Sequence, residues 1–290
     1  MTGSFQKFAA TALFAFLLAA LPARAEGVKV VASIAPVHSL LAGVMAGIGE
    51  GAGEAGLLVR GARSPHDYVM KPSDARMLHS AQVVFWIGPE MESFLAKPVA
   101  ALADTVRVVK LGGEGEEPHN WLDPQIAARM VRDMVRVLGE IDAANAERYI
   151  ENGNKVRAGL IVLERELHKV LKPVAVVPYL VYHDAYRYFE KRFDLAAHGA
   201  VAVNADRPPG AKRVSALRRL IIASQIVCVF TEPQFTPALA KTLTQGTNAR
   251  LGSLGPDGLH GTLDDLSATL SPDGTLAPLL TATERPDRNP

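Results

Sequence analysis

Cysteine is almost absent from this chain of 290 residues, since Cys228 is the only one. An internal disulfide is therefore excluded, and cysteine usage neither supports nor excludes an oxidising compartment. An excess of one charge is also lacking, because 31 lysines and arginines face 30 aspartates and glutamates, for a formal net charge of +1. This balance offers no electrostatic argument for binding nucleic acid. We expect a small solute or another protein as the partner.

Familiar catalytic and nucleotide-binding motifs are missing as well. The sequence contains no HExxH helix, no GxSxG elbow and no P-loop, and residues 47–52 give only a poor match to a glycine-rich dinucleotide motif. The sequence thus gives no sign of an enzyme of these classes.

Long apolar runs are limited to one, at residues 8–21. It is shorter than the roughly 20 residues that cross a bilayer. Lys7 precedes it, and the small residues Ala23 and Ala25 follow it at cleavage positions, as is typical of a secretory signal peptide. We expect residues 1–25 to be a signal peptide cleaved near Ala25. No lipid-attachment cysteine follows, which favours a free periplasmic protein.

Short β-rich runs alternate with helical patterns along the rest of the chain. Strands are expected at residues 28–33, 57–61, 83–88, 106–111, 175–182, 198–203 and 226–230. Helices are expected at residues 36–46, 75–81 (capped by Ser73 or Asp74), 184–193, from 212 onward and at 238–246. This alternation predicts an α/β fold with mostly parallel sheets flanked by helices.

A long helical stretch divides this pattern in two. Helical signals dominate from Pro124 to Leu171, and Asp123 before Pro124 is a strong helix start. We expect an N-terminal α/β lobe at residues 26–142, a long rigid linking helix at 143–171, and a C-terminal α/β lobe with a loose tail at 172–290. Two such lobes leave a cleft between them.

Three histidines stand where a predicted strand ends and a helix begins. They are His66, His119 and His183, in the segments SPHDYVMKPSD, EEPHNWLDP and VYHDAYRYFE. Loops at the carboxyl ends of parallel strands face such a cleft, so the three side chains are expected to converge there. Neutral imidazole is a ligand that suits Zn²⁺, which prefers about four donors in a tetrahedron. The sequence therefore predicts a metal site in the interlobe cleft.

Two aspartates adjoin these histidines. Asp67 and Asp184 can accept the second ring N–H of a histidine or cap the next helix, and capping is the preferred reading for Asp184. Four other histidines lack the strand-end setting of the first three and are expected at the surface: His38, His79, His168 and His198. Of these, His38 and His198 each flank a strand, which leaves their placement more open.

The segments SPHDYVMKPSD, HNWLDP, YHDAYRYFE and VFTEPQF, in this order, resemble the metal-binding periplasmic solute-binding proteins of ABC transporters. The chain is most similar to the ZnuA-like zinc-uptake branch of that family, over essentially the whole mature chain. The resemblance implies two α/β lobes joined by a rigid helix, with Zn²⁺ captured in the cleft and delivered to an inner-membrane ABC permease. It also implies metal ligands at His66, His119 and His183, where manganese relatives usually have glutamate at the third position. Mn²⁺ or Ni²⁺ stays an alternative cargo.

The chain departs from this branch in its late segment and its cysteine. Relatives carry a carboxylate ligand where this chain reads LGPDG at residues 254–258. The fourth ligand is therefore Asp257, His260 or a water molecule. Relatives also often pair the cysteine at the position of Cys228 with a second one near the carboxyl terminus, which this chain lacks. Glu232, in FTEPQF, is expected beside the site as a supporting residue.

The histidine-rich acidic loop that often precedes the second ligand in this branch is also reduced. Only acidic residues remain there: Glu114, Glu116 and Glu117. This absence motivates the hypothesis of a metallochaperone that replaces the loop. Competing hypotheses for the whole chain are an exported zinc hydrolase, because three histidines with an open position can activate water, and a metal-linked adhesin or chaperone. We expect a monomer.

Overall fold

The structure is a computed structural model that describes residues 27–48, 55–61, 63–102, 105–113, 117–202, 209–232, 235 and 238–253. The predicted signal peptide, Glu114, Glu116, Asp257 and His260 lie outside these residues. Within them, none of the helices combines the length and apolar character that crossing a membrane would require.

The N-terminal lobe is built on four parallel strands in the order β2-β1-β3-β4. They are β1 (Val30–Ala32), β2 (Gly56–Leu57), β3 (Val83–Trp86) and β4 (Arg107–Lys110). Successive side chains of a strand point to opposite faces of a sheet. Accordingly Val83 and Phe85 join one apolar cluster, whereas Val84 and Trp86 join another on the opposite face.

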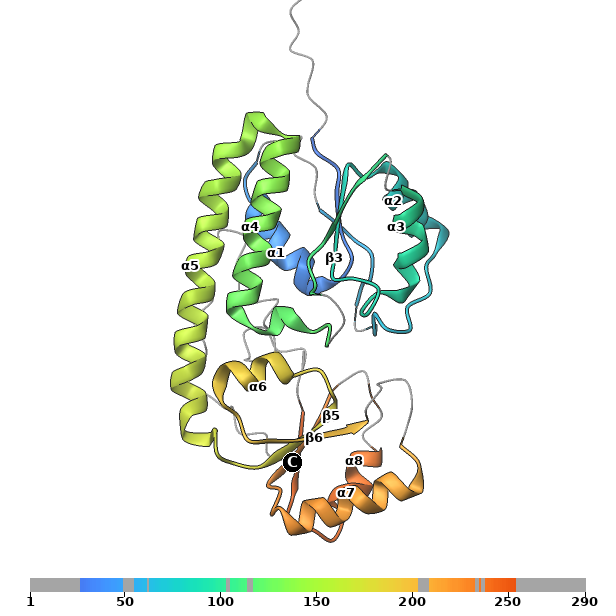
Figure 1. Cartoon of the computed structure of the whole chain (residues 1–290), viewed down its shortest axis with the longest axis vertical. Coiled ribbons are helices and arrows are strands. Elements are labelled where there is room, and N and C mark those ends of the chain that lie inside the picture. The colour runs from blue at the N-terminus through green and yellow to red at the C-terminus, as the bar shows by residue number, and fades with distance from the viewer. Residues whose placement is uncertain are drawn as a thin grey trace, which may run out of the picture.

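Helices cover both faces of this sheet (Figure 1). They are α1 (Ala35–Met45), α2 (Pro72–Ser80), the 3₁₀ turn η1 (Ser93–Leu95) and α3 (Ala96–Leu102). The predicted cap of α2 is wrong in detail, because Lys71 occupies the N-cap position. Asp74 instead lies in the first turn, where its carboxylate accepts a hydrogen bond from the backbone N–H of Lys71 at 2.8 Å.

The C-terminal lobe repeats the design with strand order β6-β5-β7-β8, again parallel. Its strands are β5 (Tyr179–His183), β6 (Ala197–Ala202), β7 (Cys228–Thr231) and β8 (Arg250–Ser253), and its helices are α6 (Arg187–Phe193), α7 (Ala211–Ala223) and α8 (Ala238–Thr244). The strand predicted from residue 175 begins four residues later, because a 3₁₀ turn, η4 (Lys172–Val174), precedes it. Cys228, expected to be buried, is half-buried with a free thiol.

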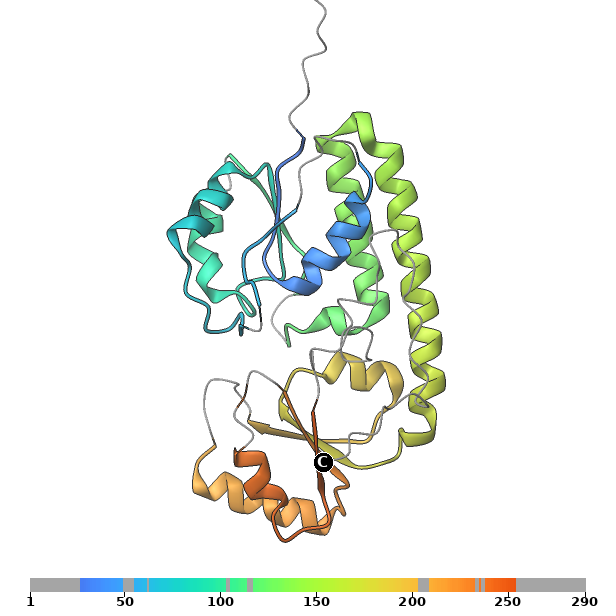
Figure 2. The ribbon, with the colours of Figure 1, turned by 180° about the vertical axis from the view of Figure 1, so that it is seen from behind.

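Two antiparallel helices form the side of the molecule, and the longer one connects the lobes (Figures 1 and 2). A 3₁₀ turn, η2 (Asn120–Leu122), leads into α4 (Pro124–Ile141), and η3 (Ala143–Asn145) leads into α5 (Ala146–Leu171). Asp123 caps α4 as predicted, since its side chain accepts from the backbone N–H of Gln125 at 2.8 Å. The chain is thus an α/β protein of two lobes joined by a long helix.

Candidate metal centre

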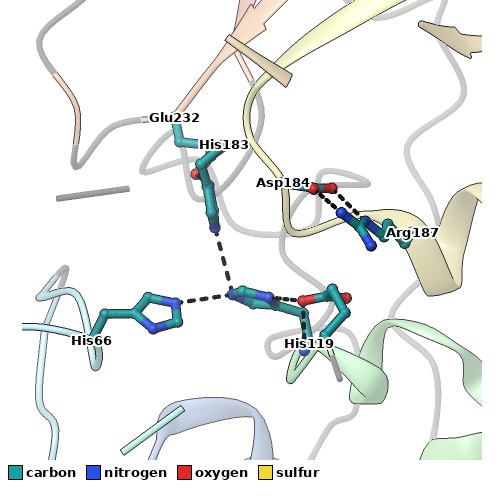
Figure 3. A network of polar contacts seen from close by, with 7 residues as sticks. His66, His119, His183, Asp184, Arg187 and Glu232 are labelled. Carbon is teal, nitrogen blue, oxygen red and sulfur yellow. Dashed lines mark hydrogen bonds and ion pairs between the residues drawn. The ribbon is translucent and has the colours of Figure 1, made fainter. Parts of the chain in front are cut away.

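The three predicted histidines approach one another between the two lobes (Figure 3). His66 lies in the loop after β2, and His119 directly precedes η2, so both come from the N-terminal lobe. His183 is the last residue of β5 in the C-terminal lobe. His119 lies between the other two in the close-up view. The site therefore depends on how the lobes sit relative to each other.

The ring nitrogens are spaced as a metal ion would require. Nε2 of His119 lies 3.3 Å from Nε2 of His66 and 3.5 Å from Nε2 of His183. One ligand atom from each residue lies within 4.8 Å of the others. A tetrahedral Zn²⁺ with bonds of about 2.0 to 2.1 Å separates its nitrogen ligands by roughly 3.3 to 3.4 Å. The residues present thus fit a zinc ion bound through three Nε2 atoms.

The surroundings of His66 favour its neutral form, which is the form that a metal ligand requires. Burial lowers its pKa from 6.5 to about 4, and the neighbouring His119 and His183 contribute to this lowering by charge repulsion, against a smaller opposing effect of Asp67. At neutral pH the imidazole is therefore uncharged, with a lone pair available for a cation.

Two glutamates contact Nδ1, the ring nitrogen that faces away from the centre, of His119 and His183. Glu117 contacts Nδ1 of His119, and Oε2 of Glu232 lies 2.6 Å from Nδ1 of His183. The two carboxylate side chains are 10% and 2% exposed. A carboxylate that holds Nδ1–H fixes the tautomer and turns Nε2 toward the metal. These contacts explain why the lone pairs face the centre.

The carboxylates are not the ones expected from chain neighbours. Asp67 is exposed. Asp184 does not cap α6, whose N-cap is Tyr186. Its carboxylate pairs with Arg187, whose Nε donates to Oδ1 at 2.9 Å. The carboxylates that contact the ring nitrogens are Glu117 and Glu232 instead.

Glu117 lies beside the candidate site although the sequence did not predict a role for it there. It lies two positions before His119, and its carboxylate also accepts from the backbone N–H of His119 at 3.0 Å. The Glu-x-His spacing is the sequence signal for this contact, although the acidic residues around Glu117 are also typical of the remnant of a loop. Glu232, expected near the site, contacts His183 across two neighbouring strands, β5 and β7.

The remaining histidines that the structure describes lie outside this group. His79, His168 and His198 are exposed, as predicted. His38 is half-buried, and its Nε2 lies 2.9 Å from the backbone oxygen of Ala55. Because Asp257 and His260 fall outside the described residues, the fourth ligand stays a prediction.

The sequence matches the model of a known protein family. A family model described as "Zinc-uptake complex component A periplasmic", ZnuA, matches residues 30–280. The chain belongs to the ZnuA family. This family comprises periplasmic components of zinc-uptake complexes and is not a family of enzymes.

Curated relatives agree with this assignment. The chain is 37% identical over 306 residues to the high-affinity zinc uptake system protein ZnuA of Brucella abortus (strain 2308), covering 87% of this chain and 90% of the relative. It is 33% identical over 286 residues to the ZnuA protein of Yersinia pestis, covering 86% of this chain and 89% of the relative. These two ZnuA proteins thus match nearly from end to end.

Solved structures share the ZnuA fold. A crystal structure of ZnuA superposes with a TM-score of 0.70 at 23% identity, covering 79% of this chain and 91% of the other. The AdcAII protein of Streptococcus pneumoniae superposes with a TM-score of 0.69 at 20% identity, covering 80% and 90%. The two-lobed architecture is therefore that of a known group of proteins.

Proposed function

We propose that this protein captures Zn²⁺ between its lobes through His66, His119 and His183 and delivers it to an inner-membrane ABC permease. The observation that carries the proposal is the spacing of the three Nε2 atoms, 3.3 and 3.5 Å from His119 to its neighbours, which suits nitrogen ligands of one tetrahedral zinc. Membership of the ZnuA family supports zinc as the cargo.

The remaining features of the proposal concern the whole chain. We propose a signal peptide at residues 1–25 cleaved near Ala25, an N-terminal lobe at 26–142, a linking helix at 143–171 and a C-terminal lobe at 172–290. The mature protein acts as a monomer in the periplasm, and a metallochaperone supplies the metal in place of the reduced acidic loop. Light scattering of the zinc-loaded protein checks the monomer, and equal loading rates from free zinc and from periplasmic extract would count against the chaperone.

The fourth ligand in this proposal is Asp257, with His260 or water as alternatives. A carboxylate beside three imidazoles completes a donor set that Zn²⁺ accepts. Zinc affinity measured for Asp257→Asn and His260→Ala separates the three: a loss in one variant identifies that residue, and no loss in either identifies water.

The central experiment is a chelator-competition titration of the mature chain with Zn²⁺, Mn²⁺ and Ni²⁺ at neutral pH. We expect one tightly bound Zn²⁺ per chain that Mn²⁺ does not displace. His119→Ala should lower zinc affinity at least about 100-fold because it removes the central ligand, and His183→Glu should shift preference toward Mn²⁺ because a carboxylate is a harder donor.

The matched control is His79→Ala, which removes an exposed histidine away from the site. Weak zinc binding, or a preference of the unaltered chain for another metal, would contradict the proposal. Zinc-dependent ester or amide hydrolysis that disappears in His119→Ala would instead favour a hydrolase; we expect binding without turnover.

A further inference from the structure

A bidentate ion pair links the two lobes. Arg192, near the end of α6, donates from Nε to Oδ1 of Asp123 at 3.0 Å and from Nη2 to Oδ2 at 2.6 Å. Asp123 caps α4 in the N-terminal lobe, whereas α6 follows β5 in the C-terminal lobe. The two residues are 69 positions apart in the chain.

The pair belongs to a polar cluster that joins three helices. Glu164 of α5 lies 3.8 Å from Nε of Arg192 and accepts from the side-chain amide of Gln125 at 2.9 Å. Gln125 in turn donates its backbone N–H to Asp123. Asp123 also raises the pKa of Arg192 through its hydrogen bonds, so the guanidinium stays charged.

Burial makes this ion pair different from the surface pairs of the molecule. The side chains of Asp123 and Arg192 are 9% and 25% exposed, whereas Arg136 and Glu140 on α4 are about half exposed. Phe193, the next residue of α6, is buried in the same apolar cluster as side chains of α4 and α5. Bidentate arginine–carboxylate pairs with little solvent around them hold a specific geometry, whereas exposed pairs contribute little.

Both ends of the ion pair connect to metal-centre histidines through short, structured segments. Asp123 closes the 3₁₀ turn that starts at His119, with backbone hydrogen bonds from Leu122 to His119 and from Asp123 to Asn120. On the other side, His183 ends β5 and Arg192 lies on the helix that follows. The segments tied together are therefore the ones that carry His119 and His183.

We propose that the Asp123–Arg192 pair is an interlobe positioning contact that holds His119 and His183 at ligand spacing before and during zinc binding. This inference rests on the proposed function. The two imidazoles come from different lobes, so binding is weakened if the lobes must first be ordered relative to each other. A contact that already orders them lowers that cost, which slows zinc release and raises affinity.

The test compares zinc release from Asp123→Asn, Arg192→Gln, Arg192→Lys and the Asp123→Asn/Arg192→Gln double variant. Asparagine keeps the N-cap of α4, so the first variant removes the ion pair without removing the cap. Zinc-loaded protein is mixed with excess chelator and the dissociation rate is followed. We expect about 10- to 100-fold faster release in each glutamine or asparagine variant. The double variant should be no worse than the worse single one, because both lose the same contact.

Arg192→Lys should fall between the unaltered chain and Arg192→Gln, because lysine keeps the charge but not the two parallel hydrogen bonds. The matched control is Lys191→Gln, which removes the same charge from the adjacent, exposed position of α6 and should leave release unchanged. Unchanged release in Arg192→Gln together with a lower melting temperature would assign the pair to stability alone and overturn the inference.

A second measurement determines the distance between the lobes in the zinc-free protein. Spin labels at Ala100→Cys on α3 and Ser215→Cys on α7, in a Cys228→Ser background, report the distance between the lobes of the zinc-free protein. We expect a broader distance distribution in Arg192→Gln than in Lys191→Gln. Identical distributions would overturn the inference.

The two proposals fail in distinguishable ways. Tight zinc binding by the unaltered chain, with unchanged release from the variants, overturns the positioning contact and leaves the proposed function intact. Absence of zinc binding by the unaltered chain overturns the proposed function, and the positioning role with it, whatever the distance distributions show.

Discussion

At the scale of single residues, the candidate metal centre consists of three imidazoles, two of which contact a carboxylate through their outer ring nitrogen. Each of two histidines uses one ring nitrogen toward the centre and the other toward a carboxylate, Glu117 behind His119 and Glu232 behind His183. A carboxylate placed beside the outer ring nitrogen raises the basicity of the ligand and limits rotation of the ring. Zinc affinity should therefore depend on two residues that do not bind the metal.

We predict that Glu117→Gln and Glu232→Gln each lower zinc affinity by about 10- to 100-fold. The amide keeps the size of the side chain but removes the charge that supports the imidazole. Chelator competition at neutral pH measures the effect, and Glu147→Gln in the first turn of α5 is the control with the same change. Wild-type affinity in both variants would show that the carboxylates only fill space.

A second residue-scale prediction concerns pH and the zinc-free protein. The pKa of His66 is lowered from 6.5, the ordinary value of a histidine in an unfolded chain, to about 4 in the folded protein. Between these two values the unfolded chain therefore binds more protons than the folded one. The contribution of His66 to stability is fully present above pH 6.5 and is lost as the pH falls toward 4.

Thermal unfolding of the zinc-free protein between pH 4 and 7 measures this effect. The melting temperature should fall with decreasing pH, and the fall should be shallower in His66→Gln, whose side chain does not titrate. His79→Gln, at an exposed position, is the control and should follow the unaltered chain. Parallel curves for all three proteins would contradict the assigned pKa shift.

At the scale of elements, close packing of the two long helices maintains the frame that carries both lobes. A Cβ atom on Gly153 of α5 would lie 2.3 Å from Cγ2 of Val135 on α4. Glycine thus has a packing role here, and α5 continues through it without a break. Burial against α4 outweighs the low helix propensity of glycine at this position.

We predict that Gly153→Ala destabilises the protein although alanine favours helix by about 1 kcal/mol. Overpacking a tight contact costs about 1 to 3 kcal/mol and should prevail at this distance. Gly139→Ala on α4 is the matched control, because its nearest neighbour would be Ala146 Cβ at an ordinary 3.6 Å. Differential scanning calorimetry should show a lower melting temperature for the first variant and an equal or higher one for the second.

Strands show where element prediction works and where it fails. Runs such as VVFW are apolar and β-branched or aromatic, and β3 is buried along its whole length, so its presence is predictable. The strand β8, with the sequence RLGS, has one large apolar residue and lies at the edge of its sheet. An edge strand of this composition is defined by pairing with β7, which a local pattern does not reveal.

At the scale of the whole molecule, the proposed zinc ligands come from two lobes that have separate sheets. Ligands from both lobes mean that bound metal stabilises their arrangement as well as the native state. We predict that zinc at about 100 times its Kd adds about 2.7 kcal/mol to the free energy of unfolding, which raises the melting temperature by about 5 to 10 °C.

The measurement is thermal unfolding with and without zinc, under conditions where free zinc is buffered. The increase should disappear in His119→Ala, which removes the histidine nearest to both of the others. The control variant His79→Ala should keep the full increase. A similar increase in His119→Ala would place the stabilising metal elsewhere on the molecule.

The sequence by itself determined the class of the fold and predicted the chemistry of the candidate metal centre. Ligand type is a property of the side chain, so His66, His119 and His183 were recognisable from their residue type and their positions after strand-like runs. Alternating apolar runs and helical periodicity likewise predict parallel α/β units, because burial of one face follows from local spacing.

Two contacts that support the candidate metal centre were decided by the tertiary structure alone. Glu232 meets His183 through sheet pairing of β5 with β7, and Arg192 meets Asp123 across 69 positions. Such contacts depend on register, helix packing and the relative placement of two lobes. None of these is encoded in a short window of sequence, so the contact of Glu232 with His183 and the interlobe ion pair emerge only once the chain is folded.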